Sequence, residues 1–217
     1  MMAQNILIVG VGGLGEHMVY EALERGARVS VMVRDEAKLR SRLSAETLNH
    51  LEKITVGDAT DTAALDEAMQ GIDVVISGNG AHRKMAREMA QAVRCNGVQK
   101  LLWPAGGTNL MAEDGVTPAY LSNMSGKEGS VRFNAEKIYR AHQVCIDEIR
   151  AAGVNYVIFC PGRMTSVGYR SPEVASTVRV NRVAGMSVSY EDAAWVMIEA
   201  ALTSQWDGEL ISAATPA

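Results

Sequence analysis

The sequence has few cysteines, no surplus of positive charge and no long apolar run, and each absence excludes a class of protein. Its 21 lysines and arginines are outnumbered by 25 aspartates and glutamates, so little attracts nucleic acid or an acidic membrane. The longest apolar stretches are strand-sized, and the first begins near the N-terminus with no signal peptide before it. We therefore expect a cytoplasmic protein that binds a small-molecule substrate, with no nucleic acid and no membrane as partner.

Disulfide and metal-binding patterns are also missing. Cys95, Cys145 and Cys160 are widely spaced, which fits neither a disulfide framework nor a CxxC metal site. The four histidines are scattered, and no two have the one-turn spacing that places a pair of ligands on one helical face. We expect reduced thiols and no bound metal.

Short apolar runs alternate with helical segments along the chain, whose 217 residues are 47% hydrophobic. This pattern is typical of an α/β fold with a doubly wound parallel sheet, the Rossmann fold, in one domain over residues 1–217. The expected strands are 5–10, 28–33, 52–56, 73–77, 99–103 and 154–159, with a seventh near 208–212. The expected helices are 14–25, 35–49, 61–70, 81–96, 134–152 and 190–203.

A glycine-rich turn directly follows the first expected strand. Gly10 permits a tight turn, Gly12 lets the backbone approach a pyrophosphate, and Gly15 lets the next helix pack on the strand. Free N–H groups at the helix start then face the phosphates. The strand, turn, helix and second strand fall at the spacing of a dinucleotide site. The residues expected to contact the cofactor here are Gly10, Gly12, Gly13, Leu14 and Gly15.

Arg34, at the end of the second expected strand, favours NADP over NAD. An NAD site usually has an acidic residue there for the ribose hydroxyl, whereas a guanidinium can pair with a 2′-phosphate. Asp35 follows directly, which keeps NAD open as the less favoured cofactor. The alternative is that Arg34 simply ends a strand at the surface.

Two long segments interrupt the alternation, 106–133 and 162–189. Both follow the carboxyl ends of strands, where open α/β sheets bind ligands, so we expect the second to form a small C-terminal region on the substrate side. Within it, Thr177–Val180 suggests a short edge strand. The alternative for each segment is an ordinary surface excursion.

Several further segments resemble one group of proteins. These are Gly26–Asp35, Gly57–Asp61, Gly71–Gly80, Ala151–Arg163 and Ser189–Ala194. Together they resemble the atypical short-chain dehydrogenase/reductase group, especially its NAD(P)H-binding branch of NmrA-like proteins and flavin and biliverdin-IXβ reductases. The resemblance covers nearly the whole chain. It implies cofactor contacts at Asp58 and Ala59 beside the adenine, at Gly78, Asn79 and Gly80, and at Pro161 beside the nicotinamide.

The chain departs from this group where catalysis is concerned. The wider superfamily uses a Tyr-x-x-x-Lys pair on one helix, but Ile138 and His142 occupy the matching positions. The serine expected after the fifth strand is also missing, and Thr108 is the nearest hydroxyl. The glycine turn is one residue shorter than the GxxGxxG turn of many members.

Other side chains can replace the missing pair. Tyr139 and His142 are three residues apart on one helix face, where they can touch, and a histidine transfers protons near neutral pH. The alternative is a satisfied polar pair on a partly buried helix. Tyr120 and Lys137 are weaker candidates, as is His82, which is more often only a polar helix start. No catalytic residue is assigned.

Two other patterns have structural interpretations. Met85 and Met89, with Val93 below them, form an apolar helical stripe that predicts core packing, with a homodimer face as the alternative. Ser189 is expected to cap the last long helix, with Glu191 and Asp192 in its first turn where the helix dipole favours negative charge.

These observations predict an NADPH-dependent oxidoreductase that acts on a small planar or carbonyl acceptor such as a flavin or quinone. Such acceptors take a hydride and obtain their proton from solvent, so the missing tyrosine does not exclude them. The alternative is a non-catalytic NADP(H) redox sensor that binds a protein partner. A nucleotide-sugar epimerase is disfavoured, because it needs a strong base at the missing tyrosine.

Overall fold

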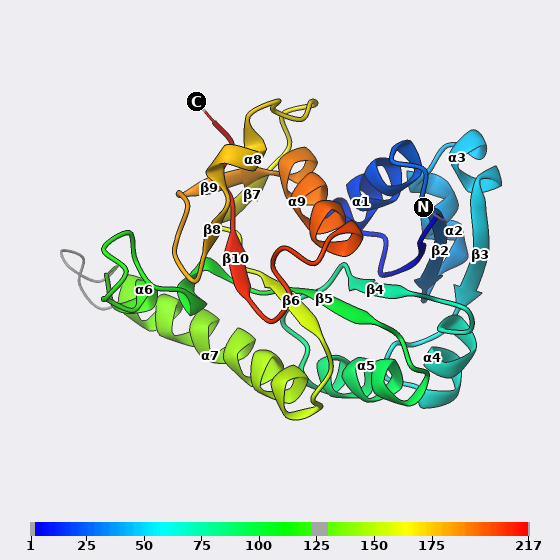
Figure 1. Cartoon of the computed structure of the whole chain (residues 1–217), viewed down its shortest axis with the longest axis horizontal. Coiled ribbons are helices and arrows are strands. Elements are labelled where there is room, and N and C mark those ends of the chain that lie inside the picture. Colours follow the sequence, from blue (N-terminus) through cyan, green and yellow to red (C-terminus); the bar gives the residue numbers. More distant parts are fainter. Residues whose placement is uncertain (1–2, 123–129, 217) are drawn as a thin grey trace.

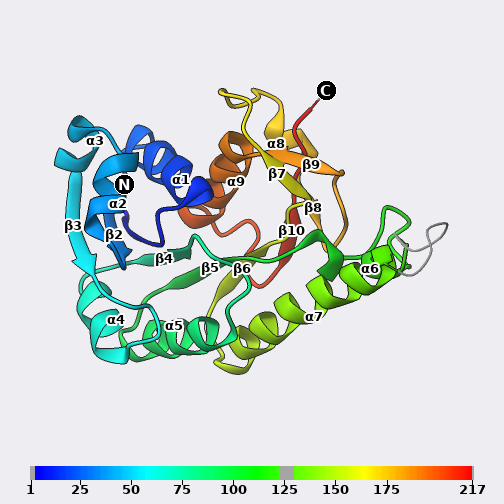
Figure 2. The ribbon, with the colours of Figure 1, turned by 180° about the vertical axis from the view of Figure 1, so that it is seen from behind.

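The computed structural model describes residues 3–122 and 130–216, and an eight-stranded sheet with helices on both faces forms its centre (Figures 1 and 2). The strand order is β3-β2-β1-β4-β5-β6-β10-β8, with β8 antiparallel to β10 and all other neighbours parallel. A second sheet pairs β7 with β9. The strands are β1 Asn5–Val9, β2 Arg28–Val33, β3 Leu51–Val56, β4 Val74–Ser77, β5 Lys100–Pro104, β6 Tyr156–Phe159, β7 Arg163–Thr165, β8 Arg179–Val180, β9 Ser187–Ser189 and β10 Leu210–Ser212.

The helices cover the sheet in two groups, as Figure 1 shows. Helices α1 and α9 pack together on one face, and α4, α5 and α7 lie on the other. The helices are α1 Gly13–Glu24, α2 Glu36–Arg42, α3 Ala45–Asn49, α4 Thr62–Ala68, α5 Arg83–Cys95, α6 Ala119–Ser122, α7 Ser130–Ala151, α8 Val174–Thr177 and α9 Tyr190–Leu202, with a 3₁₀ turn η1 at Gly107–Asn109. This is the predicted doubly wound α/β fold.

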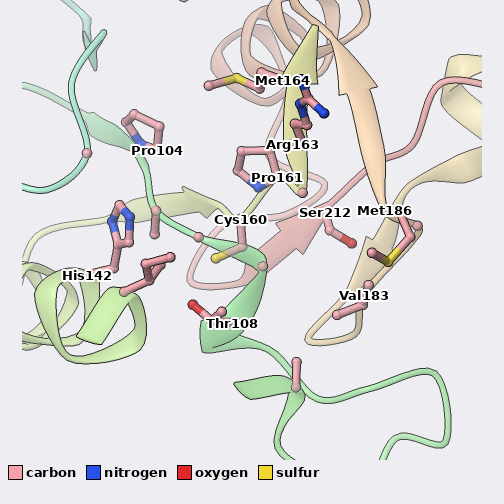
Figure 3. A pocket seen from close by; sticks show the side chains of 18 of the residues that line it. Pro104, Thr108, His142, Cys160, Pro161, Arg163, Met164, Val183, Met186 and Ser212 are labelled. Atoms are coloured by element: carbon pink, nitrogen blue, oxygen red, sulfur yellow. The ribbon is translucent and has the colours of Figure 1, made fainter. Parts of the chain in front are cut away.

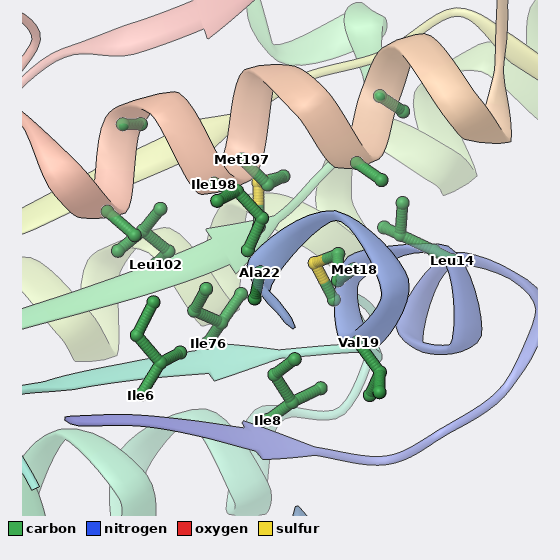
Figure 4. Close-up of a cluster of buried hydrophobic side chains, with 14 of the residues drawn as sticks. Ile6, Ile8, Leu14, Met18, Val19, Ala22, Ile76, Leu102, Met197 and Ile198 are labelled. Carbon is green, nitrogen blue, oxygen red and sulfur yellow. The ribbon is translucent and has the colours of Figure 1, made fainter. Parts of the chain in front are cut away.

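The apolar core has two halves because successive side chains of a strand point to opposite faces. Ile6 and Ile8 of β1 pack under α1 and α9, where Met18 and Met197 also lie (Figure 4). Leu7 of the same strand belongs to the other half, under α4, α5 and α7. The continuous apolar run of β1 is therefore buried on both faces, as expected of a central parallel strand.

The predicted strands are confirmed, with ends that shift by two residues or fewer. The predicted helix 35–49 is wrong, because it is divided into α2 and α3. Leu43 leaves the helix in an extended conformation and is only 3% exposed, buried in the core. Ser44 then begins α3 by accepting a hydrogen bond from the backbone N–H of Thr47 at 3.1 Å. Burial of one leucine thus outweighs the helix propensity of the segment.

The two long segments contain short elements of their own. Described residues of 106–133 include η1 and α6, and this segment is bridged to the second at Met111 and Arg182. In 162–189, β7 pairs with β9, and β8 forms the predicted edge strand beside β10. Both segments lie near the carboxyl ends of β5 and β6, so they stand over one end of the sheet (Figure 2).

The methionine stripe of α5 belongs to the core, as predicted. Met85 is 7% exposed, and Met89 and Val93 are 0% exposed. This burial places the stripe inside the molecule, whereas the possible homodimer stays a prediction. Among the described residues, no helix is both long and apolar enough to pass through a lipid bilayer.

Lys100, at the start of β5, is a buried cation. Its ammonium donates to the carbonyl oxygens of Ala200 and Thr203 at the end of α9, at 3.1 and 2.6 Å. It also pairs with Asp207 at 2.5 Å. The lysine therefore joins the sheet, the carboxyl end of α9 and the segment that leads to β10.

Candidate functional site

The strand order reverses between β1 and β4, and a groove opens at the carboxyl ends of these strands. It contains a small hollow of about 180 Å³, a middle hollow of about 610 Å³ and a large cavity of about 920 Å³. Asn79, just after β4, lines all three, and Gly10 and Arg34 line the small and middle hollows. The three spaces therefore adjoin one another along one extended groove.

The glycines of the first turn shape the centre of this groove. Gly10 adopts φ +90°, a conformation that favours glycine. A β-carbon on Gly15 or on Gly78 would collide with the carbonyl oxygen of Gly10, so α1 and the end of β4 close on the turn only without side chains there. Gly13 likewise packs against the ring of Tyr190.

Gly12 differs from its neighbours because the space in front of it is open. A β-carbon on Gly12 would meet no protein atom within 4 Å, and Gly12 lines the middle hollow. It stands at the N-cap of α1 and provides no side-chain hydrogen bond, so the first backbone N–H groups of the helix are left for an anion. The turn therefore fits a pyrophosphate in the middle hollow.

Two cations also line the middle hollow, Arg34 after β2 and Lys38 in α2. In the described part of the chain, no carboxylate forms an ion pair with Arg34. Asp35 is the N-cap of α2 and accepts a hydrogen bond from the backbone N–H of Lys38 at 3.1 Å. Asp35, the acid that kept NAD open as the cofactor, is thus held at the start of α2. Lys38 was not predicted from the sequence as a cofactor residue, although its position four residues after Arg34 could have indicated it.

The small hollow has apolar walls and a polar edge. Val9 and Met32 line it together with the predicted residues Asp58 and Ala59. Hydrogen bonds from Thr60, chiefly from its backbone N–H at 2.8 Å, hold the pKa of Asp58 below its usual range, and the charge of Arg34 adds to this effect. A flat aromatic base with hydrogen-bonding edges suits such a slot.

The large cavity lies at the ends of β5 and β6, beneath the two long segments (Figure 3). Its wall is mainly apolar, with Leu14, Pro104, Pro161 and Met186 among its residues. The predicted residues Gly78, Asn79 and Gly80 form its border with the rest of the groove. At about 920 Å³ the cavity is at the upper end of ligand pockets, roughly 300–1,000 Å³, and it suits a largely apolar molecule.

His142 of α7 lies on the wall of this cavity, and Figure 3 shows its ring near Pro104. β-Carbons on Gly80 and Gly106 would come within 3.2 and 3.1 Å of the ring, so these glycines make room for it. Burial lowers the pKa of His142 below its usual 6.5, against a smaller opposing effect of the Gly80 backbone. Its Nδ1 atom is buried without a hydrogen-bond partner. Burial therefore favours the neutral form of the imidazole, and Nδ1 is enclosed by protein rather than open to the cavity.

The expected contact between Tyr139 and His142 does not form. Tyr139 stacks instead on Tyr120, with ring centroids 4.3 Å apart, and neither tyrosine lines the large cavity. The cause is α6, which brings Tyr120 onto the outer part of α7. His82 is the N-cap of α5, accepting a hydrogen bond from the backbone N–H of Met85 at 3.2 Å, and it lines the small hollow. Of these candidates, only His142 reaches the large cavity.

Three further side chains differ in whether they line the large cavity. Thr108 of η1 lines the large cavity, whereas Lys137 is exposed on α7 and does not. Cys160 also lines it, but burial raises the pKa of this thiol strongly and keeps it protonated. Within residues 3–122 and 130–216, no cluster of three or more His, Cys, Asp or Glu side chains is arranged to hold a metal ion.

Glu191 and Asp192 do more than accompany the cap of α9. Ser189 caps the helix as predicted, accepting from the backbone N–H of Asp192 at 2.9 Å. The Asp192 carboxylate, fully buried, also accepts from the N–H of Ser171 and the hydroxyl of Thr215, both at 2.7 Å. Glu191 accepts from the N–H of Gly168 at 2.7 Å. Capping alone therefore does not explain these acids, which secure the segment after β7.

Comparisons with known proteins agree with this geometry. A family model described as NAD(P)H-binding matches residues 10–204. No curated protein matches the chain. Similar solved structures include a short-chain dehydrogenase/reductase from Veillonella parvula in complex with NADP, with a TM-score of 0.75 and 14% identity over 99% of this chain and 96% of that one.

Two further structures are similar at comparable levels. A protein from Streptococcus pneumoniae, provisionally named an NADH-flavin reductase, has a TM-score of 0.69 and 19% identity over 99% of this chain and 100% of that one. A provisionally named epimerase from Bacteroides thetaiotaomicron has a TM-score of 0.71 and 21% identity over 100% of this chain and 99% of that one. At these identities the likeness shows the fold alone.

Proposed function

The chain belongs to the NAD(P)H-binding family, within an atypical short-chain dehydrogenase/reductase-like group, and from this premise we propose an NADP(H)-dependent oxidoreductase that reduces a small planar or carbonyl acceptor. The continuous groove carries the proposal. It leads from the cations Arg34 and Lys38, past the glycine turn, to the large apolar cavity. One dinucleotide and one acceptor meeting at the border residue Asn79 fit such a groove.

The preference for NADP is supported by charge. Arg34 and Lys38 lie on one wall of the middle hollow, and Asp35 is engaged in capping α2. A 2′-phosphate is attracted by the two cations, and its hydrogen bonds to a guanidinium are charge-assisted. A ribose hydroxyl, by contrast, would meet an Asp35 carboxylate that is engaged by the Lys38 backbone through Oδ1 and lies 3.8 Å from the Lys38 ammonium through Oδ2.

The residues of the large cavity suggest how the reaction proceeds. When bound, a reduced nicotinamide supplies a hydride. Pro104, Pro161 and Leu14 shield the meeting point from water, and the ring of His142 forms part of the same wall. Overall, one NADPH, one acceptor and one proton are consumed, giving NADP⁺ and an acceptor reduced by two electrons. The proton comes from solvent.

A non-catalytic NADP(H) sensor is the second candidate, and one observation favours it. Ile138, at the position of the catalytic tyrosine, lines the large cavity and is 46% exposed, so an apolar side chain stands where an acid would act. A sensor would bind NADP and NADPH with different affinities, or would bind a protein partner differently with each.

The first experiment measures NADPH oxidation with flavins, quinones and carbonyl compounds. Turnover supports the oxidoreductase. If NADPH binds but no acceptor is reduced, the oxidoreductase is wrong and the sensor is retained only if the two redox forms bind differently.

The second experiment tests the choice of cofactor by calorimetric titration with NAD, NADP and their reduced forms. Arg34→Ala and Lys38→Ala should each weaken NADP binding by about tenfold and leave NAD binding nearly unchanged. Arg40→Ala is the control, because Arg40 lies in the same helix but pairs with Glu36. Equal losses for NAD and NADP would contradict the phosphate assignment.

The proposal includes a cytoplasmic location, which the unpaired state of Cys95, Cys145 and Cys160 supports.

A further inference from the structure

Arg163 is a third cation of the groove, and it lines the large cavity, far from the glycine turn in sequence. It begins β7 directly after Pro161 and Gly162, and its backbone N–H donates to the carbonyl oxygen of Met186 at 3.0 Å. Pairing of β7 with β9 fixes the backbone at this point. Figure 3 shows its guanidinium group on the same side of the cavity as Met164 and Pro161.

The guanidinium of Arg163 has no acidic partner. Several other arginines of the described chain pair with a carboxylate, as Arg25 does with Glu199 and Arg83 with Glu148. Within residues 3–122 and 130–216, neither an ion pair nor a side-chain hydrogen bond involves Arg163. An unpaired guanidinium on the wall of a cavity is available to an anion from outside the chain.

Two acids, Glu113 and Asp114, also line the cavity, but neither is a partner of Arg163. Asp114 lines the wall, but its carboxylate accepts hydrogen bonds from Val116 and Thr117, which lower its pKa to about 2. Glu113 belongs to the same turn, across the isolated bridge of Met111 with Pro118, and is exposed. Neither acid pairs with Arg163.

The surroundings of Arg163 specify the rest of the ligand. Met164, Val183 and Met186 line the same cavity, and Met186 is 81% exposed. Figure 3 shows Met186 and Val183 together on one side of the cavity. Apolar surface around one unpaired cation suits a molecule with an apolar body and one negative group.

We propose that Arg163 binds a carboxylate or phosphate of the acceptor, so that the substrate of the large cavity is an anionic, otherwise apolar planar molecule. The proposal specifies the substrate of the proposed oxidoreductase, and it rests on that function in treating the bound anion as the acceptor. A guanidinium binds both anions in the same two-pronged geometry.

The test compares acceptors that differ only in the anion. One arm uses flavin mononucleotide against riboflavin, and the other uses a naphthoquinone with and without a carboxylate. The wild type should show a KM about tenfold lower for the anionic member of the preferred pair, with similar kcat. Preference in the first arm identifies a phosphate and preference in the second a carboxylate. Equal KM values in both arms, or a preference for the uncharged members, would overturn the proposal.

Variants locate the effect at Arg163. Arg163→Gln should raise the KM of the anionic acceptor about tenfold and leave the uncharged one unchanged, and Arg163→Lys should restore part of the loss. Arg94→Gln is the control, since Arg94 is an exposed arginine of α5 that does not line the groove. Its KM values should equal those of the wild type.

Calorimetry separates this proposal from the proposed function. Flavin mononucleotide and the naphthoquinone carboxylate are titrated into the NADP⁺-loaded protein, and NADPH is titrated into the free protein. Anion binding that needs Arg163, without any turnover, would reject the oxidoreductase and retain the anion site. If Arg163→Gln weakens NADPH binding as much as it weakens binding of the acceptors, the proposal is overturned, because Arg163 would then hold the cofactor. Absence of anion binding to the wild type would overturn it as well.

Discussion

Gly12 and Gly15 are three residues apart and should respond to an added methyl group in opposite ways. A β-carbon on Gly12 meets no protein atom and enters the middle hollow, whereas one on Gly15 meets the carbonyl oxygen of Gly10. Gly12→Ala should therefore leave stability nearly unchanged and weaken dinucleotide binding by about tenfold or more. Gly15→Ala should destabilise the fold by roughly 1–3 kcal/mol through overpacking.

Urea unfolding and calorimetric titration of both variants check this prediction, and each variant is the control of the other. A Gly12→Ala protein that binds NADPH like the wild type would mean that the pyrophosphate lies elsewhere.

Residues of the cofactor site are predictable where one local constraint determines them. Gly10, Gly12 and Arg34 follow directly from a strand and its turn, so spacing alone indicated their positions. Arg163 and His142 reach the same cavity from β7 and α7, and nothing local relates them. Which residues of distant segments face one space depends on packing of the whole sheet, and a single sequence does not report it.

At the scale of elements, acidic side chains in the first turn of α9 accept hydrogen bonds from the segment after β7 and so anchor it. Asp192→Ala would leave the buried N–H of Ser171 and the half-buried hydroxyl of Thr215 without their acceptor. We expect a loss of about 2–3 kcal/mol in the free energy of unfolding. Glu173→Ala is the control in the same region, because this side chain is exposed and makes no capping hydrogen bond to α8, and it should change stability by less than about 0.5 kcal/mol. Chemical unfolding measures both, and equal effects would argue against the anchor.

Glu191 makes the stability of this anchor dependent on pH. Burial raises its pKa, but backbone N–H donors, including those of Gly168 and Val167, outweigh burial and bring the pKa below the ordinary 4.5. Because the folded pKa is the lower one, the carboxylate stabilises the fold above about pH 4.5, and this contribution is lost as pH falls through the folded pKa.

Glu191→Gln removes this contribution, so the stability difference from the wild type should be constant above about pH 5 and shrink below it. Urea unfolding between pH 3 and 7 provides the measurement. A difference that grows on acidification would contradict the assigned direction.

The division of α2 from α3 shows why element boundaries are harder to predict than elements. The segment 35–49 has the composition of one helix, and Ser44 alone indicates a second helix start. What decides the break is the burial of Leu43, a contact with residues distant in sequence. Strands such as β1 and β2 were predictable because their apolar runs are short, continuous and bounded by turn residues.

At the scale of the whole molecule, Lys100 joins the sheet to α9 and to the chain before β10. Lys100→Met keeps most of the side-chain volume but removes the donor to the carbonyls of Ala200 and Thr203 and the ion pair with Asp207. The other carboxylate oxygen of Asp207 still accepts from Asn155 at 2.8 Å. Because Asp207 is 29% exposed, we expect a loss of about 2 kcal/mol, less than for a fully buried pair.

Lys53→Met is the matched control. Lys53 pairs with Glu67 at the surface, where a lost ion pair costs about 0.5 kcal/mol or less. Thermal and urea unfolding of both variants test the difference. Similar losses would mean that the buried ammonium contributes no more than a surface one.

Asn79 touches the small hollow, the middle hollow and the large cavity. Fragments bound in the three spaces could each be extended toward this residue, which makes Asn79 the natural junction for chemical linking. An adenine-like fragment, a phosphate mimic and an anionic aromatic ring, joined there by short tethers, would form a bisubstrate inhibitor. Such a compound would need no new contact, since joining its parts lowers the entropic cost of binding them separately.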